Sequence, residues 1–423
     1  MGKPKTKSFK NGLRYLPIVM KEQRTVTVLV LVETGSKYET KEKNGLAHFL
    51  EHMCFKGTTK RPGALIVAHE LDGLGAEYNA FTGHEYTGYY VKVAARHLPQ
   101  AIDVVADISI DPLFKADDIE REKGVIADEI NMYEDLPMRK VADNFMTLLY
   151  GEQPAGWPIA GPKETIRTFT REDFVRYRKE HYVASATTVV IAGAFDPKKT
   201  EKLVKEKFAQ IRTGKKSGKK KVVDKQTSPA ITVEQKGSDQ THLILGVRSY
   251  PIGHSSRAAL NVLAGVLGGG MSSRLFDRIR AKMGVGYYVR AGNDSFTDHG
   301  FLAASAGVDN TRVAEVITAI LEEFARMKNE LLSDEELTKV KDYIAGRLVL
   351  GLESSDELAE FYGFQEVLKR EMRTPEEAIK EIRAVTAKDV RALTKKIFVT
   401  EHLNLALIGP IKDDVTLRDL LVL

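Results

Sequence analysis

Two histidines and a glutamate stand close together in the segment Gly45-Leu-Ala-His48-Phe-Leu-Glu51-His52-Met. On an α-helix that advances about 100° per residue, His48, Glu51 and His52 fall within a sector of roughly 100°. Two imidazoles one turn apart can both bind a zinc ion, which leaves the carboxylate beside the metal. Zinc lowers the pKa of a bound water, and a neighbouring carboxylate can take the remaining proton during attack on a carbonyl. The alternative is a solvated helix face that carries two incidental histidines.

A zinc site of this kind needs a third ligand. The chain has one cysteine, Cys54, so a cysteine-rich site is excluded and the metal must be held by histidine and carboxylate. In the acidic segment 120–132, Glu122 and Glu129 are two helical turns apart, whereas Asp128 would point about 100° away from Glu129. We therefore prefer Glu129 as the ligand and Glu122 as a residue that tunes the charge of the site. Acidic helices are commonly just solvated, and the spacing alone leaves that alternative open.

The order H-x-x-E-H is the inverse of the commoner zinc motif H-E-x-x-H. With its surroundings, GLAHFLEHMCFKGT, it resembles the active-site helix of the insulinase, pitrilysin and mitochondrial processing peptidase family. In that family a glutamate ligand lies about 77 residues beyond the second histidine, and another glutamate precedes it by seven; counted from His52, these are Glu129 and Glu122. The resemblance implies a Zn²⁺ site formed by His48, His52 and Glu129. It also implies that Glu51 is the general base and that Glu122 belongs to the catalytic group.

Two further strings resemble substrate-binding parts of the same family. The first is similar to the strand that pairs with the substrate backbone, and it consists of Asn79, Ala80, Phe81 and Thr82. The second contains Arg280 and Tyr287, seven residues apart, which resemble a pair that binds substrate carbonyls and stabilises the oxyanion. Without the resemblance, the first string would be an ordinary turn into a strand and the second an unremarkable pair.

The chain also repeats itself at one offset. Ile166-Arg167 recurs as Ile382-Arg383, and the strand-like run that ends at Gly193 recurs in the run that ends at Gly409, in both cases 216 residues later. A shared offset for separate segments indicates two copies of one domain. We expect an N-terminal zinc-binding domain at 1–212, a basic linker at 213–228, and a homologous domain at 229–423. The second copy lacks the histidine pair and carries Arg280 and Tyr287.

Local patterns predict a mixture of strands and helices. Runs rich in β-branched residues predict strands at 26–33, 85–94, 187–193, 242–247, 299–307 and 403–408. Helical periodicity predicts helices at 44–56, 63–74, 97–108, 115–134, 171–180, 256–267, 312–328 and 334–370. The elements do not follow a strict βαβ alternation. We therefore expect an α+β fold with helices packed on a mixed or antiparallel sheet in each copy. The resemblance implies that this is the fold of processing peptidases.

Composition, net charge and targeting signals restrict the partners and the location that we expect. Of 423 residues, 29% are charged and 43% hydrophobic, which is typical of a globular chain, and the formal net charge of +5 is weak for a nucleic-acid binder. The lysine run at 215–221 has no interleaved aromatic residues for base stacking, so we interpret it as a linker. Neither a secretory signal nor an apolar stretch of 18 residues is present. We expect a cytoplasmic protein without nucleic-acid or membrane partners.

These features together predict a zinc-dependent endopeptidase that hydrolyses peptides or short unfolded segments inside a closed chamber. In two-half relatives the arginine and tyrosine face the metal across a cavity. For a chain of this length, the resemblance implies a homodimer, or a heterodimer with a homologous subunit, that shares its active sites. The alternative function is an inactive structural or regulatory subunit, or a peptide-binding protein of the same fold.

Overall fold

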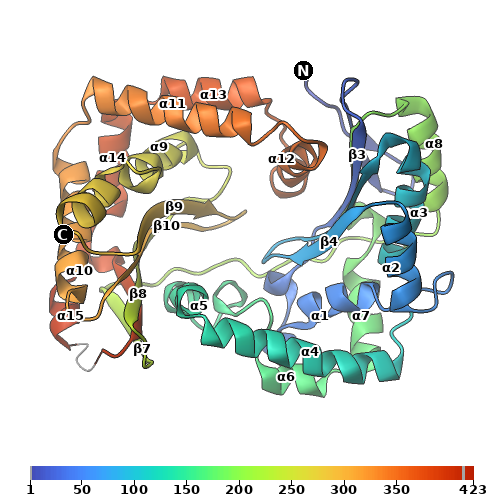
Figure 1. Cartoon of the computed structure of the whole chain (residues 1–423), viewed down its shortest axis with the longest axis horizontal. Helices are drawn as coiled ribbons and strands as arrows, with labels where there is room; N and C mark the ends of the chain where they lie inside the picture. Colours follow the sequence, from blue (N-terminus) through green and yellow to red (C-terminus); the bar gives the residue numbers. More distant parts are fainter. Residues whose placement is uncertain (1, 412–414) are drawn as a thin grey trace. The chain divides into compact units, whose positions relative to one another are not determined.

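The computed structural model describes residues 2–411 and 415–423, which form two compact units, each built on one β-sheet (Figure 1). The first unit contains Met1–Asn131, Trp157–Lys220 and Gly351–Thr374. The second unit contains Met132–Gly156, Lys221–Leu350 and Pro375–Leu423. Each unit is thus assembled from three separate stretches, which differ from the contiguous domains at 1–212 and 229–423 expected from the repeat.

The sheet of the first unit has six strands in the order β1-β2-β6-β3-β5-β4. Its strands are β1 (Lys7–Ser8), β2 (Arg14–Val19), β3 (Thr25–Val32), β4 (Glu77–Thr82), β5 (Thr87–Ala94) and β6 (Thr187–Gly193). β2 and β6 run parallel, and the other neighbours are antiparallel. The central strands β3 and β6 are covered on both faces, which explains their nearly continuous β-branched and aliphatic sequence. β4 lies at an edge, so one side of its backbone is left without a neighbouring strand in this sheet.

Alternate residues of β3 reach two different cores. Val26, Val28 and Val30 point to the larger core, and Leu29 and Leu31 to the smaller one. The helices over the larger core are α1 (Leu46–Cys54), α2 (Ala64–Gly73), α3 (Leu98–Ile110), α4 (Ala116–Asp135), α6 (Lys163–Thr168), α7 (Arg171–His181) and α8 (Pro197–Lys207). One helix, α12 (Ser355–Leu368), covers the opposite face and lies beside β3 in Figure 1.

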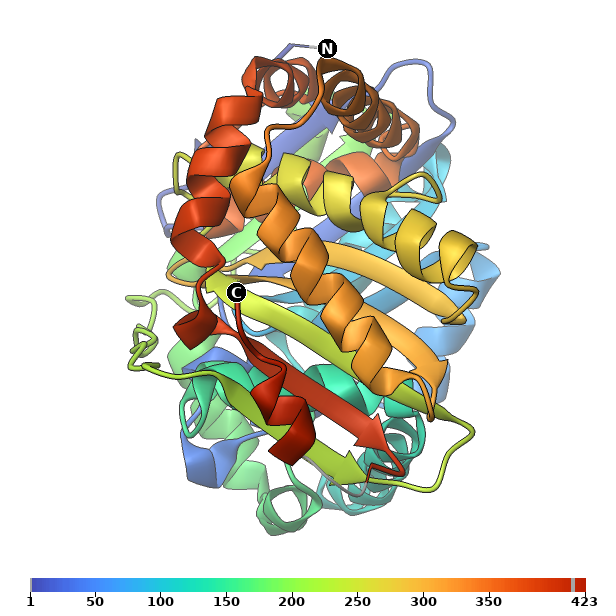
Figure 2. The same cartoon turned by 90° about the vertical axis from the view of Figure 1, so that its left-hand side faces the viewer.

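The second unit repeats this topology. Its five strands have the order β7-β11-β8-β10-β9, with the pair β7 and β11 parallel. They are β7 (Ala230–Gln235), β8 (Gln240–Ser249), β9 (Tyr288–Ser295), β10 (Gly300–Asp309) and β11 (Asn404–Gly409). The helices packed around its larger core are α9 (Arg257–Gly268), α10 (Val313–Asn329), α11 (Asp334–Leu350), α13 (Pro375–Ala384), α14 (Ala387–Ile397) and α15 (Val415–Asp419). Figure 2 shows α9, α10 and α14 lying over this sheet.

Helix α5 (Pro137–Tyr150) covers the other face of the second sheet, where Val141 and Phe145 pack with Ala406 and Ile408. Shifted by the repeat offset of 216, residues 137–150 become 353–366, which nearly coincides with α12. Each copy in the sequence therefore supplies the matching helix to the sheet of the other copy. This exchange is why the compact units are discontinuous, and no local sequence pattern encodes it.

The predicted fold class is confirmed, with corrections to individual elements. The segment 334–370, predicted as one helix, is two: α11 ends at Leu350, and Ser354 forms a capping box with Glu357 at the start of α12. The elements that were not predicted are the strands β1, β2, β7 and β9 and the helices α5, α6, α8, α13, α14 and α15. Short 3₁₀ segments lie at Ser36–Tyr38, Lys41–Lys43, Ala95–His97, Pro154–Gly156, Ala184–Ala186 and Thr400–His402, and a π-helical segment at Phe276–Lys282.

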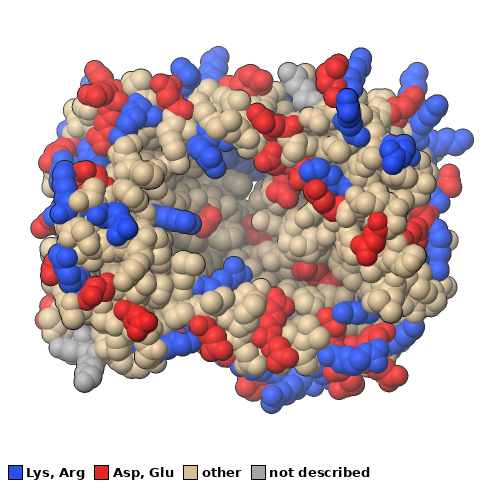
Figure 3. Space-filling view, in the orientation of Figure 1, with Lys and Arg blue, Asp and Glu red and all other residues tan. Residues whose placement is uncertain are grey.

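The linker at 213–228 contains no helix or strand, but part of it is bound to the first unit. Lys216 pairs with Glu33 at 2.7 Å and Lys219 with Glu85 at 2.8 Å, and both carboxylates are buried. The lysine run is therefore only partly solvated. On the face shown in Figure 3, basic and acidic side chains are interspersed. No helix among the described residues is both long and apolar enough to cross a membrane.

Candidate metal centre

Helix α1 carries both histidines, and a buried carboxylate holds its first turn. Its N-cap, Gly45, has φ +98°, a conformation that favours glycine, and a Cβ there would lie 2.5 Å from the carbonyl oxygen of Ala160. Glu39 takes the place of a capping side chain, because its carboxylate accepts hydrogen bonds from the backbone N–H groups of Gly45 (2.9 Å) and Ala47 (2.6 Å). The start of α1 at Leu46, two residues before His48, is therefore fixed.

The two faces of α1 have different environments. Phe49, Leu50 and Met53 are completely buried in the larger core, and the Phe49 ring meets Phe174 edge-on with centroids 4.9 Å apart. Burial of such side chains contributes roughly 1.5–3 kcal/mol each, which anchors the helix. Cys54 is also buried and lies beside the Tyr89 hydroxyl. The apolar face sets the rotation of α1, and the imidazoles emerge on the opposite side.

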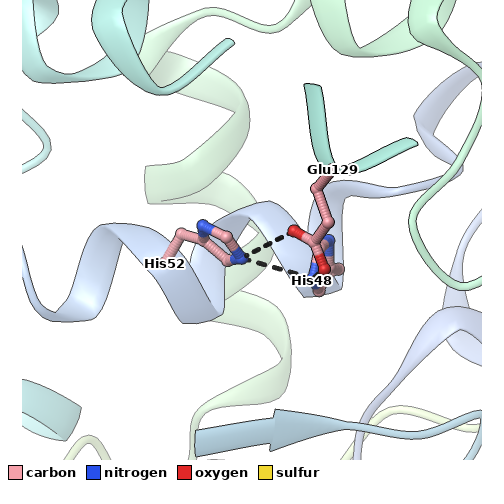
Figure 4. Close-up of side chains that lie close together, drawn as sticks. All are labelled: His48, His52 and Glu129. Atoms are coloured by element: carbon pink, nitrogen blue, oxygen red, sulfur yellow. Dashed lines mark hydrogen bonds and ion pairs between the residues drawn. The ribbon is translucent and has the colours of Figure 1, made fainter. Parts of the chain in front are cut away.

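His48 and His52 converge with Glu129, which reaches them from α4 (Figure 4). The Nε2 atoms of the two histidines are 3.3 Å apart. The carboxylate oxygens of Glu129 lie 3.6 Å from Nε2 of His48 and 3.5 Å from Nε2 of His52. The three side chains are about one-fifth exposed or less. The sequence placed these residues on one site through the resemblance, and the structure brings their donor atoms together.

The spacing of these donor atoms fits one small metal ion. Two ligands bonded to tetrahedral zinc at about 2.0–2.1 Å lie roughly 3.3 Å from each other. The three separations here, 3.3, 3.5 and 3.6 Å, are close to that value. Two imidazoles and one carboxylate also leave a fourth position for water, the arrangement of catalytic rather than structural zinc sites.

Glu122 contacts the His52 ring at Nδ1, the nitrogen that does not face Glu129. Its Oε1 lies 2.9 Å from Nδ1 of His52, and its Oε2 is 2.6 Å from the ammonium of Lys56. Glu122 is buried, and burial acts to raise the pKa of its carboxyl, but the bonds to His52 and Lys56 outweigh it and lower that pKa. A charged acceptor on Nδ1 orients the ring and leaves Nε2 for the metal. Lys56 was not predicted, although it follows His52 by four residues.

The two imidazoles differ electrostatically. Burial lowers the pKa of His48 to about 4, and the neighbouring His52 acts in the same direction, so His48 is neutral near pH 7. Burial also opposes the charged form of His52, but its hydrogen bond to Glu122 and the nearby carboxylates outweigh burial and raise its pKa. In the part of the chain that the structure describes, the buried Nδ1 of His48 has no hydrogen-bond partner.

Glu51 is buried on α1, the helix that carries both histidines, and it interacts electrostatically with His52 and Glu129. Burial raises the pKa of its carboxyl, and the charge of Glu129 acts in the same direction, whereas a hydrogen bond from Thr82 opposes the rise. The Thr82 hydroxyl donates to Oε2 of Glu51 at 2.5 Å. A carboxyl with a raised pKa next to a metal position is suited to accept a proton.

The string from Asn79 to Thr82 forms most of the edge strand β4, so its backbone is placed to pair with an extended chain. The ring of Phe81 packs on Tyr86 and Phe364, and the Thr82 hydroxyl is bonded to Glu51. These two side chains are therefore engaged within the unit. Contact of the strand with substrate stays a prediction.

Arg280 and Tyr287 belong to the other compact unit. Arg280 is exposed in the π-helical segment, and Tyr287 is 69% exposed after the glycines at 284 and 286, which both have positive φ. The neighbouring Arg278 is instead paired with the buried Glu323 at 3.2 Å. The role of Arg280 and Tyr287 in binding substrate stays a prediction.

Comparisons with known proteins agree with this architecture. A family profile described as insulinase (peptidase family M16) matches residues 18–163, and one described as the peptidase M16 inactive domain matches residues 168–344. The chain is 35% identical to the Bacillus subtilis protein named "Uncharacterized zinc protease YmxG", over 95% of this chain and 97% of that protein. It is 33% identical to a protein of Streptomyces coelicolor, also named as an uncharacterized zinc protease, over 95% and 88% of the two chains.

Solved structures show the same fold. A protease from Helicobacter pylori superposes with a TM-score of 0.91 at 21% identity, over 96% of this chain and 99% of that one. A Pseudomonas fluorescens structure described as a peptidase M16 inactive domain has a TM-score of 0.89 at 18% identity, over 97% and 98% of the two chains. The chain belongs to the insulinase (M16) family of peptidases, in its short two-domain form, as the resemblance implied. Its relatives are named zinc proteases.

Proposed function

We propose that the protein is a zinc-dependent endopeptidase in which His48, His52 and Glu129 hold the metal. The observation that carries this proposal is the separation of 3.3–3.6 Å among the three donor atoms, with the buried carboxylate of Glu51 beside them. The names of the relatives support zinc as the metal and peptide hydrolysis as the reaction class.

Bound zinc would acidify its water ligand and polarise the scissile carbonyl. Glu51 would take a proton from the attacking water on a carboxylate oxygen and pass it to the leaving amine. Glu122 would keep the His52 ring in the tautomer and orientation that present Nε2. Each of these roles uses a side chain that the first unit already holds in place.

The proposed substrates are peptides or short unfolded segments. The edge strand β4 supports this class, because an open strand edge binds an extended backbone through main-chain hydrogen bonds. A folded domain rarely offers such a segment. Enclosure of the substrate in a chamber and residence in the cytoplasm are further parts of the proposal.

Arg280 and Tyr287 are proposed to bind the substrate carbonyl and the developing oxyanion. Their exposure supports this role, because guanidinium and phenol donors must be free to meet a substrate. We propose that a second copy of this chain, or a homologous subunit, shares in forming the active site. Assay of an Arg280→Ala protein mixed with a Glu51→Gln protein tests sharing between two copies of this chain. Recovery of activity in the mixture supports it, and lack of recovery contradicts it.

The proposed activity is tested by measuring bound zinc and peptide cleavage together. Zinc-loaded protein is incubated with a mixed peptide library and the products are identified by mass spectrometry, with a chelator-treated sample as control. We expect about one zinc per chain and internal cleavage that disappears with the chelator. Bound zinc without cleavage would instead favour a peptide-binding protein, and absence of both would favour an inactive subunit.

A further inference from the structure

Glu51 has one side-chain hydrogen-bond partner among the residues that the structure describes. The Thr82 hydroxyl donates to Oε2 of Glu51 at 2.5 Å, and no donor of the described residues is bonded to Oε1. Hydrogen bonds to charged acceptors are short and about twice as strong as neutral ones. A single bond of this type selects one orientation of an otherwise rotatable carboxylate.

The fold explains why Thr82 meets Glu51. Side chains alternate along β4, so that Tyr78 and Ala80 pack on the core beneath α1, while Phe81 packs on the opposite core with α12. Thr82 follows Ala80 by two residues, so its side chain lies on the same face of β4 as Tyr78 and Ala80 and faces α1. It ends the strand, directly opposite Thr87 of β5, which holds its backbone in the sheet.

We propose that Thr82 is a positioning residue for Glu51, rather than a residue whose side chain binds substrate. Its hydroxyl holds Oε2, so that Oε1 is the oxygen presented to the attacking water. Because Thr82 closes the strand expected to bind the substrate backbone, the same strand fixes both the peptide and the base that serves it. This inference rests on the proposed peptidase function.

Three variants separate the hydroxyl from the shape of the side chain. Thr82→Val removes the donor and keeps the volume, and Thr82→Ser restores the donor. Thr87→Val is the matched control, because Thr87 is a buried threonine in the same strand pair whose hydroxyl donates to the Thr34 carbonyl at 3.0 Å. Zinc content, kcat and KM are measured for each with a peptide that the library identifies.

We expect Thr82→Val to lower kcat about tenfold or more while KM changes less than about twofold, because one charge-assisted hydrogen bond is lost. Zinc content should be unchanged, and Thr82→Ser and Thr87→Val should keep kcat near the wild-type value. The inference is overturned if Thr82→Val keeps its kcat, if Thr82→Ser is equally slow, if Thr87→Val loses as much, or if KM alone rises.

A second measurement does not depend on turnover. Crystal structures of the zinc-loaded wild type and of Thr82→Val should show the Glu51 carboxylate on Thr82 in the first and rotated away in the second. An identical Glu51 position in both would overturn the inference. Absence of peptide cleavage by the zinc-loaded wild type would instead overturn the proposed function, and the two structures would still decide the role of Thr82.

Discussion

Nδ1 of His52 in α1 lies 2.9 Å from Oε1 of Glu122 in α4, although 70 residues separate the two in the sequence. The same helix α4 brings Glu129 to the other side of the imidazole, where its carboxylate is 3.5 Å from Nε2. Each nitrogen of the His52 ring thus faces a carboxylate, and the two carboxylates come from residues two helical turns apart on α4. We therefore expect the affinity for zinc to depend on Glu122, which is not one of the three proposed ligands.

Replacing Glu122 by Gln should weaken zinc binding by about 10- to 100-fold, because the charged acceptor that orients His52 is lost. Competition with a chromophoric chelator measures the Kd. The control is Glu120→Gln on the same helix, since Glu120 is largely exposed and, among the described residues, forms an ion pair only with Lys123. Equal zinc affinity of the Glu122→Gln and wild-type proteins would contradict the proposal that Glu122 orients the His52 ring for zinc binding.

Lys56→Met should weaken zinc binding in the same direction but less, by roughly two- to tenfold. The change removes the ammonium 2.6 Å from Oε2 of Glu122 and leaves the bond to His52 in place. Lys60→Met is the control, because Lys60 pairs with Asp103 near the surface. If the two lysine variants bind zinc equally well, Lys56 has no part in the site.

His181 should make the apoprotein less stable in acid. Burial lowers the pKa of its imidazole from 6.5 to about 4, so between these values the unfolded chain binds the proton more tightly than the folded one. The free energy of unfolding is therefore unaffected by this group above pH 6.5 and falls as the pH drops toward 4. In a His181→Phe protein, the phenyl ring can take the place of the imidazole beside Tyr177. Because phenylalanine does not bind a proton, the decrease in the free energy of unfolding in acid should be smaller by roughly 1–3 kcal/mol.

Denaturant unfolding of the wild-type and His181→Phe proteins at pH 7 and pH 4.5 measures this effect. Both are kept in the same chelating buffer, so that the metal ligands contribute equally to the two proteins. The stability difference between the proteins should shift in favour of His181→Phe at the lower pH. A difference that does not change with pH would rule out buried, neutral His181 as a cause.

A fragment of residues 1–228 should not fold stably, because it lacks α12. Leu29, Leu31 and Val190 are buried on the α12 side of the first sheet and would be exposed to water. We expect strong binding of a hydrophobic dye and rapid proteolysis, with zinc binding restored when residues 229–423 are co-expressed. A protease-resistant fragment that binds zinc alone would show that α12 is dispensable.

Much of this fold was predictable because its periodicity is local. The β-branched runs of β3, β6 and β11 and the 216-residue offset indicated sheets in two copies. The exchange of α5 and α12 was not predictable, because an amphipathic pattern shows that a face is buried without showing against which sheet. The break between α11 and α12 was readable in principle from Gly351 and the Ser354 capping box, but the helical periodicity on both sides concealed it.

The residues of the candidate site also differ in how far the sequence could predict them. The spacing of His48 and His52 defines a helix face by itself, whereas Glu129 was assigned through a family resemblance. The sequence named Thr82 only as part of a substrate-binding strand and did not name Glu39. The hydrogen bonds of these two residues to α1 arise from chain segments that the sheet and the loop before α1 bring together. No sequence pattern indicates that a threonine or a glutamate will make such a hydrogen bond.

The most direct test of the account is the Glu51→Gln protein, assayed for zinc and for peptide cleavage in the same preparation. Glutamine is nearly isosteric with glutamate, and Glu51 is not a predicted zinc ligand, so the zinc content should stay at the wild-type level. Because the amide cannot accept the water proton, kcat should fall at least about a hundredfold. Cleavage at a rate near that of the wild type, with zinc bound, would contradict the mechanism.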